Sequence, residues 1–90
     1  MAYQIFVNDA WVAPEKAHVS VKDIGFLRGY GIFDFFRIMD GQAIFMSDHL
    51  DRFLSSASKM GLSLSYSKES LAILINEIAA KSVDPCLGVK

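Results

Sequence analysis

The sequence predicts an α+β fold, a small antiparallel sheet packed with two helices, on three observations. Residues 32–39 are rich in β-branched and aromatic side chains and precede Asp40-Gly41, a pair typical of a two-residue hairpin turn. Two later stretches, 47–60 and 67–82, repeat apolar residues at the helical period. Four of the expected strands come before these helices, and no repeat, linker or low-complexity tract divides the chain.

The N-terminal residues predict a short β-hairpin. Residues 3–7 are rich in strand formers, Asn8-Asp9 supplies a turn, and residues 10–12 form the returning strand, which Pro14 ends. Residues 17–21 alternate only weakly between apolar and polar side chains. This part of the chain is expected to hold two strands and little other regular structure.

A glycine-containing loop connects the hairpin to the central strand. Asp23 is suited to cap a single helical turn over residues 24–27, and Arg28-Gly29-Tyr30-Gly31 follows. Two glycines around a tyrosine indicate a sharp bend or a close approach of the backbone to another group. An ordinary loop into a strand needs glycine nearly as often, so the pattern alone is weak evidence for a site.

The central hairpin has a defined expected register. With Asp40 and Gly41 as the turn, strands over residues 32–39 and 42–46 place Phe36 opposite Phe45 and Phe35 opposite Met46. Both faces of the first strand are mostly apolar, which is typical of a strand covered on both sides, and each carries one charge. That charge needs a partner or an opening to water, so we expect a cleft at one face. One face carries Ile32, Asp34, Phe36 and Ile38; the other carries Phe33, Phe35, Arg37 and Met39.

Two helices are expected to follow. Ser47 is suited to cap the first, which Gly61 ends, and Ser67 is suited to cap the second, which Pro85 bars from continuing. The first apolar stripe consists of Leu50, Phe53, Leu54, Ala57 and Met60, and the second of Leu71, Leu74, Ile75 and Ile78. His49, Arg52 and Ser56 lie on the polar side of the first helix, which we expect to face away from the core.

The last residues predict one more strand. Residues 86–90 include a β-prone valine and no stop signal, so a strand is expected to begin there. We therefore expect residues 1–90 to form one small domain that is truncated from a longer chain. A hydrophobic content of 52% is enough for a core at this length and also fits a surface made for a missing neighbour.

Composition excludes several functions. A net charge of −1 gives no basic field for nucleic acid or an anionic membrane surface, and no apolar run is long enough to span a bilayer. The single Cys86 excludes an internal disulfide and makes a thiolate metal site improbable, so no metal is expected. A reducing cytoplasm is the expected location.

Arginines are the main candidates for binding chemistry. Arg52 has the forked guanidinium that suits oxyanions, but the pattern alone favours a solvated helix arginine paired with Asp48 at i, i+4. His49 could orient that arginine, although a lone exposed histidine more often has no special role. Arg37 lies between aromatic neighbours, so a cleft and a structural ion pair are equally good explanations.

The remaining polar residues are less informative. Arg28 and Tyr30 could recognise a carboxylate, but loop surface explains them better by pattern. Asp34, Asp40 and Asp51 show no spacing of paired acid and base carboxylates. No Ser-His-Asp, HExxH or Walker pattern occurs.

The motifs in their order resemble a known family. The chain contains FVNDAWV and, further on, KDIGFLRGYGIFDFFRIMDGQAIFMSDHLDRFLSSASKMGL. These resemble the N-terminal domain of the fold-type IV pyridoxal-phosphate enzymes, the class with branched-chain aminotransferases, D-amino-acid aminotransferases and aminodeoxychorismate lyase. The most specific parts are RGYGIFD, the Asp40-Gly41 turn and HLDRF. The resemblance covers nearly the whole chain.

The resemblance implies roles for particular residues. Arg52 takes the position of the arginine that binds the cofactor phosphate, which outweighs the pattern-based reading. Phe33 and Phe35 take positions that line the substrate pocket, on the strand face of Arg37. Arg28, beside Tyr30, stands where members often have an aromatic residue that reaches the partner subunit's active site. The Schiff-base lysine and the glutamate facing the pyridine nitrogen lie in a larger C-terminal domain, so no catalytic residue is expected here.

The function implied by the resemblance is that of a cytoplasmic, homodimeric, pyridoxal 5'-phosphate-dependent aminotransferase of class IV. Such an enzyme transfers an amino group between a small amino acid and a 2-oxo acid, and residues 1–90 alone are expected to be inactive. The alternatives are an aminodeoxychorismate lyase-like enzyme, a stand-alone α+β anion-binding or interaction module, and a structural oligomerisation domain.

Overall fold

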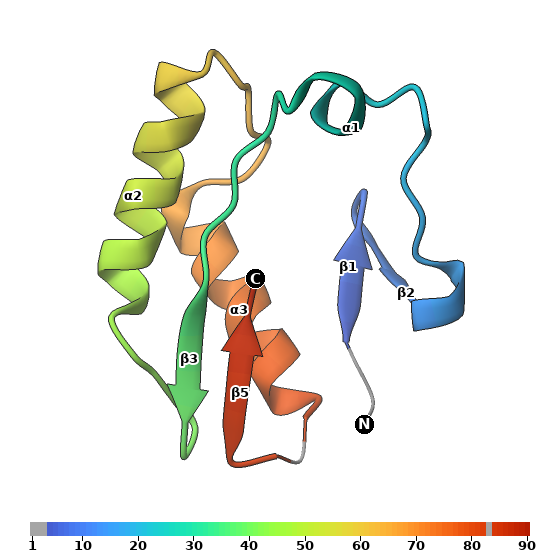
Figure 1. Cartoon of the computed structure of the whole chain (residues 1–90). Coiled ribbons are helices and arrows are strands. Elements are labelled where there is room, and N and C mark those ends of the chain that lie inside the picture. Colours follow the sequence, from blue (N-terminus) through green and yellow to red (C-terminus); the bar gives the residue numbers. More distant parts are fainter. Residues whose placement is uncertain (1–3, 83) are drawn as a thin grey trace. The chain divides into compact units, whose positions relative to one another are not determined.

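The computed structural model describes residues 4–82 and 84–90 of the chain (Figure 1). The described residues form two compact units, one ending at Gly31 and one beginning at Ile32. Both units contain antiparallel strands, and the second also contains the two long helices, so the predicted α+β fold is confirmed.

The first unit begins with the expected hairpin. β1 (Ile5–Val7) pairs antiparallel with β2 (Ala10–Val12), and Phe6 lies opposite Trp11 with ring centroids 5.1 Å apart. Asn8 and Asp9 both have positive φ, 49° and 66°, as a two-residue hairpin turn requires. The expected start of the first strand at residue 3 lies outside the described residues.

Short helical segments complete the first unit. A 3₁₀ turn, η1 (Pro14–Lys16), follows β2, and residues 17–21 form no strand. α1 (Ile24–Arg28) is capped as predicted, because the Asp23 carboxylate accepts a hydrogen bond from the backbone N–H of Gly25. Gly29 ends α1 with a φ of 63°, a left-handed conformation that glycine adopts without strain. The sharp bend expected of the glycine loop is therefore confirmed.

The central hairpin has the predicted register but shorter strands. β3 (Phe36–Met39) pairs with β4 (Gln42–Ala43) around Asp40 and Gly41, which have φ values of 51° and 78°. Met39 faces Gln42, as the turn predicted. The backbone N–H of Ile44 still donates to the carbonyl oxygen of Arg37, and regular pairing then ends.

The pairs expected further from the turn were wrong. Phe45 has a φ of 55° and caps the next helix, so neither Phe45 nor Met46 continues the strand opposite Phe36 and Phe35. Phe36 instead pairs with Val89 on the other edge of β3. The sequence shows the local turn chemistry, whereas the early exit of the chain into a helix depends on the packing of that helix against the sheet.

The strand expected at the end of the chain is present. β5 (Cys86–Val89) pairs antiparallel with β3 and gives the strand order β4-β3-β5. β3 is therefore the central strand of this sheet. β5 is an edge strand within the described residues.

Two helices cover one side of this sheet. α2 (Met46–Lys59) begins two residues earlier than predicted, with Phe45 in place of Ser47 at the N-cap. α3 (Lys68–Ala80) begins as predicted, because the Ser67 hydroxyl accepts from the N–H of Ser70 while the Ser70 hydroxyl accepts from the N–H of Ser67. The ammonium group of Lys68 in α3 forms an ion pair with the carboxylate of Asp51 in α2 at 2.9 Å, and this pair links the two helices.

The core of the second unit lies between the helices and one sheet face. Its buried members are Phe36, Ile38, Leu50 and Ile75, and the predicted apolar stripes of both helices contribute to it. The opposite face is exposed: Phe33 is 74% exposed and Phe35 46%. The prediction that the strand is covered on both sides therefore holds for one face only within this unit.

Candidate functional site

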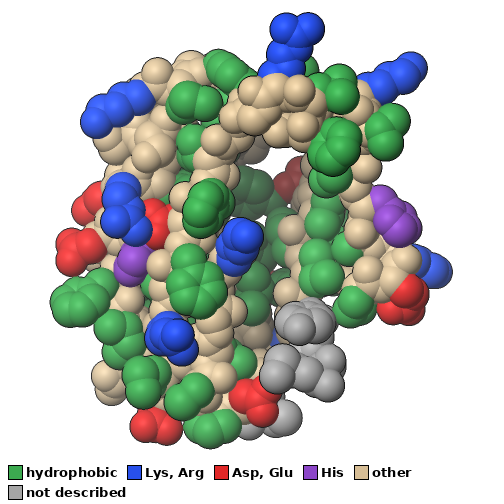
Figure 2. All heavy atoms as spheres, viewed as in Figure 1, with side chains coloured by type: hydrophobic (Ala, Val, Ile, Leu, Met, Phe, Trp, Pro, Cys, Tyr) green, Lys and Arg blue, Asp and Glu red, His purple; other side chains and the backbone are tan. Residues whose placement is uncertain are grey.

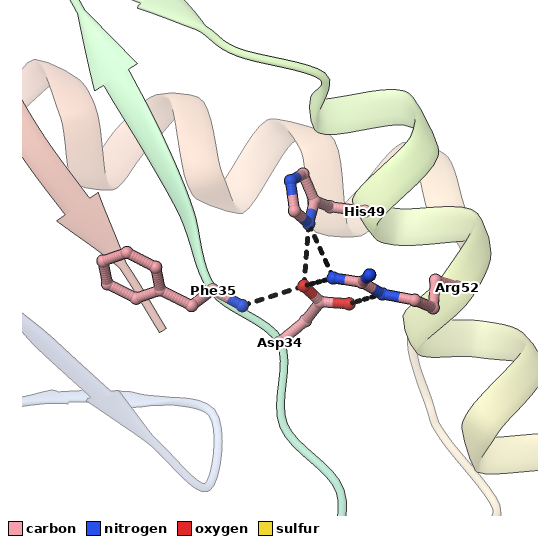
Figure 3. Close-up of polar contacts among 4 residues, drawn as sticks. All are labelled: Asp34, Phe35, His49 and Arg52. Atoms are coloured by element: carbon pink, nitrogen blue, oxygen red, sulfur yellow. Dashed lines mark hydrogen bonds and ion pairs between the residues drawn. The ribbon is translucent and has the colours of Figure 1, made fainter.

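A cluster of Asp34, His49 and Arg52 lies where the chain enters β3. Asp34 belongs to the strand face that is turned toward the helices, and its side chain is only 9% exposed. His49 and Arg52 are three residues apart in α2, so their side chains project from the same side of that helix. Figure 3 shows both side chains turned toward the Asp34 carboxylate, with the Phe35 ring on the other side of the backbone.

The carboxylate of Asp34 forms a bidentate pair with Arg52. Arg52 Nε donates to Oδ2 at 2.9 Å, and Nη2 donates to Oδ1 at 2.7 Å (Figure 3). The backbone N–H of Phe35 also donates to Oδ1, at 2.8 Å. Charge-assisted, two-point contacts of this kind fix the plane of a guanidinium as well as its position.

His49 supports the same carboxylate from the core side. Its Nδ1 lies 2.7 Å from Asp34 Oδ1 and 3.2 Å from Arg52 Nη2. Because arginine can only donate, Nδ1 either donates to Oδ1 or accepts from Nη2, according to which ring nitrogen carries the proton. The imidazole also stacks on the buried Phe36 ring, with centroids 5.3 Å apart and planes at 25°. The expectation that this side of α2 faces away from the core was therefore wrong for His49.

Asp34 and Arg52 each stabilise the charged form of the other. Hydrogen bonding from Arg52 is the main cause that holds the pKa of Asp34 well below its ordinary value, with His49 and the Phe35 N–H acting in the same direction and desolvation opposing them. The Asp34 hydrogen bond in turn raises the pKa of Arg52. Asp34 is therefore a carboxylate and Arg52 a guanidinium throughout the physiological range.

The lowered pKa of Asp34 predicts that the free energy of unfolding depends on pH in the acidic range. The pKa of Asp34 is lower in the folded chain than its ordinary value of 3.8, so its contribution to stability is complete well above 3.8 and is lost as the pH falls below it. The difference in free energy of unfolding between the parent and Asp34→Asn is expected to be constant above about pH 5 and to shrink below about pH 4. Urea unfolding across this range measures it, and an unchanged difference down to about pH 2 would contradict the assignment.

Arg52 keeps an edge for another anion. Its side chain is 66% exposed although its partner Asp34 is nearly buried. The two bonds to Asp34 use Nε and Nη2, and Nη2 also lies 3.2 Å from His49 Nδ1, so Nη1 is the donor group left for another oxyanion. A fork of this kind suits a phosphate or a carboxylate.

The predicted substrate-side residues lie on the opposite, exposed face of the strand. Phe33, Phe35 and Arg37 alternate with the residues that face the helices, and the guanidinium carbon of Arg37 lies 6.0 Å from the centroid of the Phe35 ring. Lys90 Nζ lies 5.2 Å from the centroid of Phe33. Figure 2 shows hydrophobic and basic side chains intermixed over β3 and β5. Such a surface suits a small ligand with an apolar part and a carboxylate.

A glycine makes room for one of these rings. Gly88 pairs with Arg37 across β3 and β5, and a Cβ placed on Gly88 would lie 2.7 Å from the Phe35 ring. Any larger residue at position 88 would therefore displace that ring. The position of the Phe35 ring thus depends on Gly88 in β5, a strand that is distant in sequence.

Arg28 and Tyr30 belong to the first unit. Arg28 is the last residue of α1, and Tyr30 follows the C-capping Gly29. Both are exposed. Arg52, Phe33, Phe35 and Arg37 all lie in the second unit, so the structure brings only those four predicted site residues into one compact unit.

Sequence reasoning did not assign two members of the cluster. Asp34 was set aside because it showed no acid and base spacing, and His49 was considered as a residue that could orient Arg52, but a special role was not favoured. The pairing of Arg52 with Asp48 expected from pattern was also wrong, because its bidentate partner is Asp34. The useful signal was Asp34, the single charge on one apolar face of residues 32–39, because such a charge needs a partner. His49 and Arg52, at i, i+3 spacing in the following helix, were the two donors that could supply one.

Metal and membrane signals are both missing in the described part of the chain. Among residues 4–82 and 84–90, no three His, Cys, Asp or Glu side chains gather in a way that could hold a metal ion. No helix in these ranges has the length and apolar character needed to cross a membrane.

Comparison with known proteins gives consistent matches. The family described as amino-transferase class IV matches residues 31–90. A D-alanine aminotransferase of Staphylococcus aureus (strain N315) is 40% identical over 81 residues, which are 90% of this chain and 27% of that protein. A D-alanine aminotransferase of Listeria innocua is 34% identical over 79 residues, 88% of this chain and 27% of that protein.

A solved structure shares the fold. A branched-chain aminotransferase from the archaeon Thermoproteus uzoniensis, crystallised with norvaline, superimposes with a TM-score of 0.85 and 25% identity. The match covers 98% of this chain and 31% of that one. The chain thus spans about a quarter of the length of the curated relatives that it matches.

Proposed function

Because the chain belongs to the amino-transferase class IV family, we propose that it is the N-terminal domain of a pyridoxal-phosphate-dependent aminotransferase. The complete enzyme transfers an amino group between a small amino acid and a 2-oxo acid. The names of the relatives and of the solved neighbour support this reaction class. A lyase-like enzyme, a stand-alone binding module and an oligomerisation domain are not favoured by these matches.

One observation carries the proposal: an exposed arginine fork is held by a nearly buried carboxylate. Arg52 is always charged, and its Nη1 edge is not used by Asp34. This donor set fits a phosphate group, so Arg52 is assigned to the phosphate of the cofactor. Pyridoxal phosphate, when bound, supplies the electron sink for amino-group transfer.

The exposed face of β3 and its preceding residues is assigned to the substrate. Phe33 and Phe35 offer apolar surface that excludes water around the reacting amino acid, and Arg37 offers a guanidinium for a carboxylate. Arg28 and Tyr30 are assigned to substrate contacts on the strength of the family pattern. These residues bind and orient the substrate and take no part in proton transfer.

The covalent chemistry is assigned to a lysine outside these residues. All six lysines of the chain occupy exposed or half-exposed positions, whereas a lysine used in covalent catalysis is desolvated in its site. We further assign a homodimer and a cytoplasmic location, which the family resemblance and the single cysteine favour.

The test compares the 90-residue chain with an enzyme of the relatives' length that contains it. The longer protein is expected to transfer amino groups from D-alanine or a branched-chain amino acid to a 2-oxo acid in the presence of pyridoxal phosphate. The 90-residue chain is expected to be inactive and to show no stoichiometric borohydride trapping of the cofactor at one lysine. The measurements are a coupled 2-oxo acid assay and peptide mass spectrometry.

Two outcomes would contradict the proposal. Stoichiometric trapping at one lysine of the 90-residue chain would place the catalytic lysine within it. A longer protein that binds pyridoxal phosphate yet transfers no amino group from any of these donors would contradict the reaction class.

A further inference from the structure

We propose that Asp34 is a positioning residue for anion binding: it holds the Nε and Nη2 edge of Arg52 and thereby leaves the Nη1 edge for the cofactor phosphate. This inference rests on the proposed function, because it requires that Arg52 binds the phosphate. Asp34 itself touches neither cofactor nor substrate in this arrangement.

The need for positioning follows from the exposure of Arg52. A long arginine side chain that is 66% exposed would ordinarily occupy several rotamers, and ordering it on binding costs conformational entropy. Two bonds of 2.9 Å and 2.7 Å to Asp34 remove most of this freedom before any ligand arrives. A guanidinium ordered in advance binds more tightly because less freedom is lost on binding.

The carboxylate can act as an anchor because it is itself fixed from the core. Oδ1 accepts from the Phe35 N–H at 2.8 Å and lies 2.7 Å from His49 Nδ1. The His49 ring stacks on Phe36, which is 7% exposed and belongs to the central strand. A continuous series of contacts therefore runs from Phe36 in the sheet core through His49 and Asp34 to the exposed guanidinium. Figure 3 shows the part from His49 to Arg52.

Asp34 also has an opposing effect, because its negative charge repels a phosphate. Water around the exposed Arg52 screens that repulsion, whereas the loss of ordering on removing Asp34 is not screened. We therefore expect the positioning effect to exceed the repulsion. The sign of the change in affinity on neutralising Asp34 separates the two effects.

The experiment neutralises Asp34 in the complete enzyme and measures binding of two probes by spectral titration: pyridoxal phosphate and phosphate-free pyridoxal. In Asp34→Asn the shape is kept, but the amide nitrogen cannot accept a hydrogen bond, so only one of the two bonds to Arg52 can form. Affinity for pyridoxal phosphate is expected to fall about threefold to tenfold. Affinity for pyridoxal is expected to stay the same.

Two further variants isolate the route through Arg52. In an Arg52→Ala background, Asp34→Asn is expected to have no further effect on affinity, since there is no guanidinium to position. Asp51→Asn is the matched control, because it removes the same charge from a neighbouring position that pairs with Lys68 instead. This control is expected to leave affinity for pyridoxal phosphate unchanged.

A measurement on the unmodified enzyme covers the case in which Asp34→Asn does not fold. The Nε–H signal of Arg52 in ¹⁵N NMR is expected to be observable without ligand and to keep its chemical shift when pyridoxal phosphate binds, because that edge stays with Asp34. A large change of this signal on binding would mean that phosphate displaces Asp34, which would overturn the inference.

The remaining outcomes are distinct. Tighter binding of pyridoxal phosphate by Asp34→Asn, or an equal loss in the Arg52→Ala background, would overturn the positioning role and leave the proposed function intact. Unchanged affinity on Arg52→Ala alone would instead overturn the assignment of the phosphate to Arg52.

Discussion

Replacing Arg52 with alanine is expected to weaken pyridoxal phosphate binding about tenfold to a hundredfold in the complete enzyme. The substitution removes charge-assisted hydrogen bonds to a doubly charged phosphate. Arg52→Lys is expected to recover only part of the affinity, because an ammonium keeps the charge but not the fork. Cofactor release on dialysis and spectral titration measure the loss.

The experiment on Arg52→Ala must separate loss of the cofactor from unfolding of the protein. α2 itself is expected to persist, because alanine is a good helix former, but Arg52→Ala leaves the nearly buried Asp34 without its main partner. The double variant Asp34→Asn with Arg52→Ala removes that unpaired charge and serves as the control. If the double variant is as stable as the parent and still binds pyridoxal phosphate as tightly, the phosphate role of Arg52 is wrong.

Replacing Ile38 with alanine is expected to lower the free energy of unfolding by about 2 to 5 kcal/mol. Ile38 is 2% exposed and lies in the central strand, where Ala43 and Leu87 pair with it from either side. Truncation leaves a cavity between the sheet and both helices. A loss of this size is a large part of the total stability of a small domain.

The neighbouring residue supplies a matched control. Met39 follows Ile38 in the same strand but is 47% exposed on the other face, so Met39→Ala is expected to cost less than about 1 kcal/mol. Urea unfolding of the apo protein gives both values from the shift in midpoint at constant slope. Similar losses for the two variants would mean that the sheet does not bury the face assigned here.

The parts of the fold that sequence predicted are those set by nearby residues. The Asp40-Gly41 turn fixed which residues of β3 and β4 face each other, and Ser67 and its partner Ser70 fixed the start of α3. The ends of the strands were predicted less well. Regular pairing ends after Ala43 because Phe45 is the N-cap of α2, and that depends on contacts between α2 and the sheet.

The site was predicted in part for the same reason. Arg52 was selected by resemblance, whereas its spacing alone favoured a neighbour in the same helix. Its actual partner, Asp34, is eighteen residues away, and only the folded chain brings the two together. The unpaired charge on an apolar strand face indicated that some partner existed but not which one.

The alternation along residues 33–39 has a consequence for how such an enzyme can change. Side chains at 34, 36 and 38 turn toward the helices, where they serve the anchor and the core, and those at 33, 35, 37 and 39 turn away from them. On the proposed assignment of this face to the substrate, mutations at the odd positions are expected to alter ligand preference with little effect on the anchor or the core. A library randomised at those four positions should keep most members folded and cofactor-competent, which makes this strand a natural target for diversifying specificity.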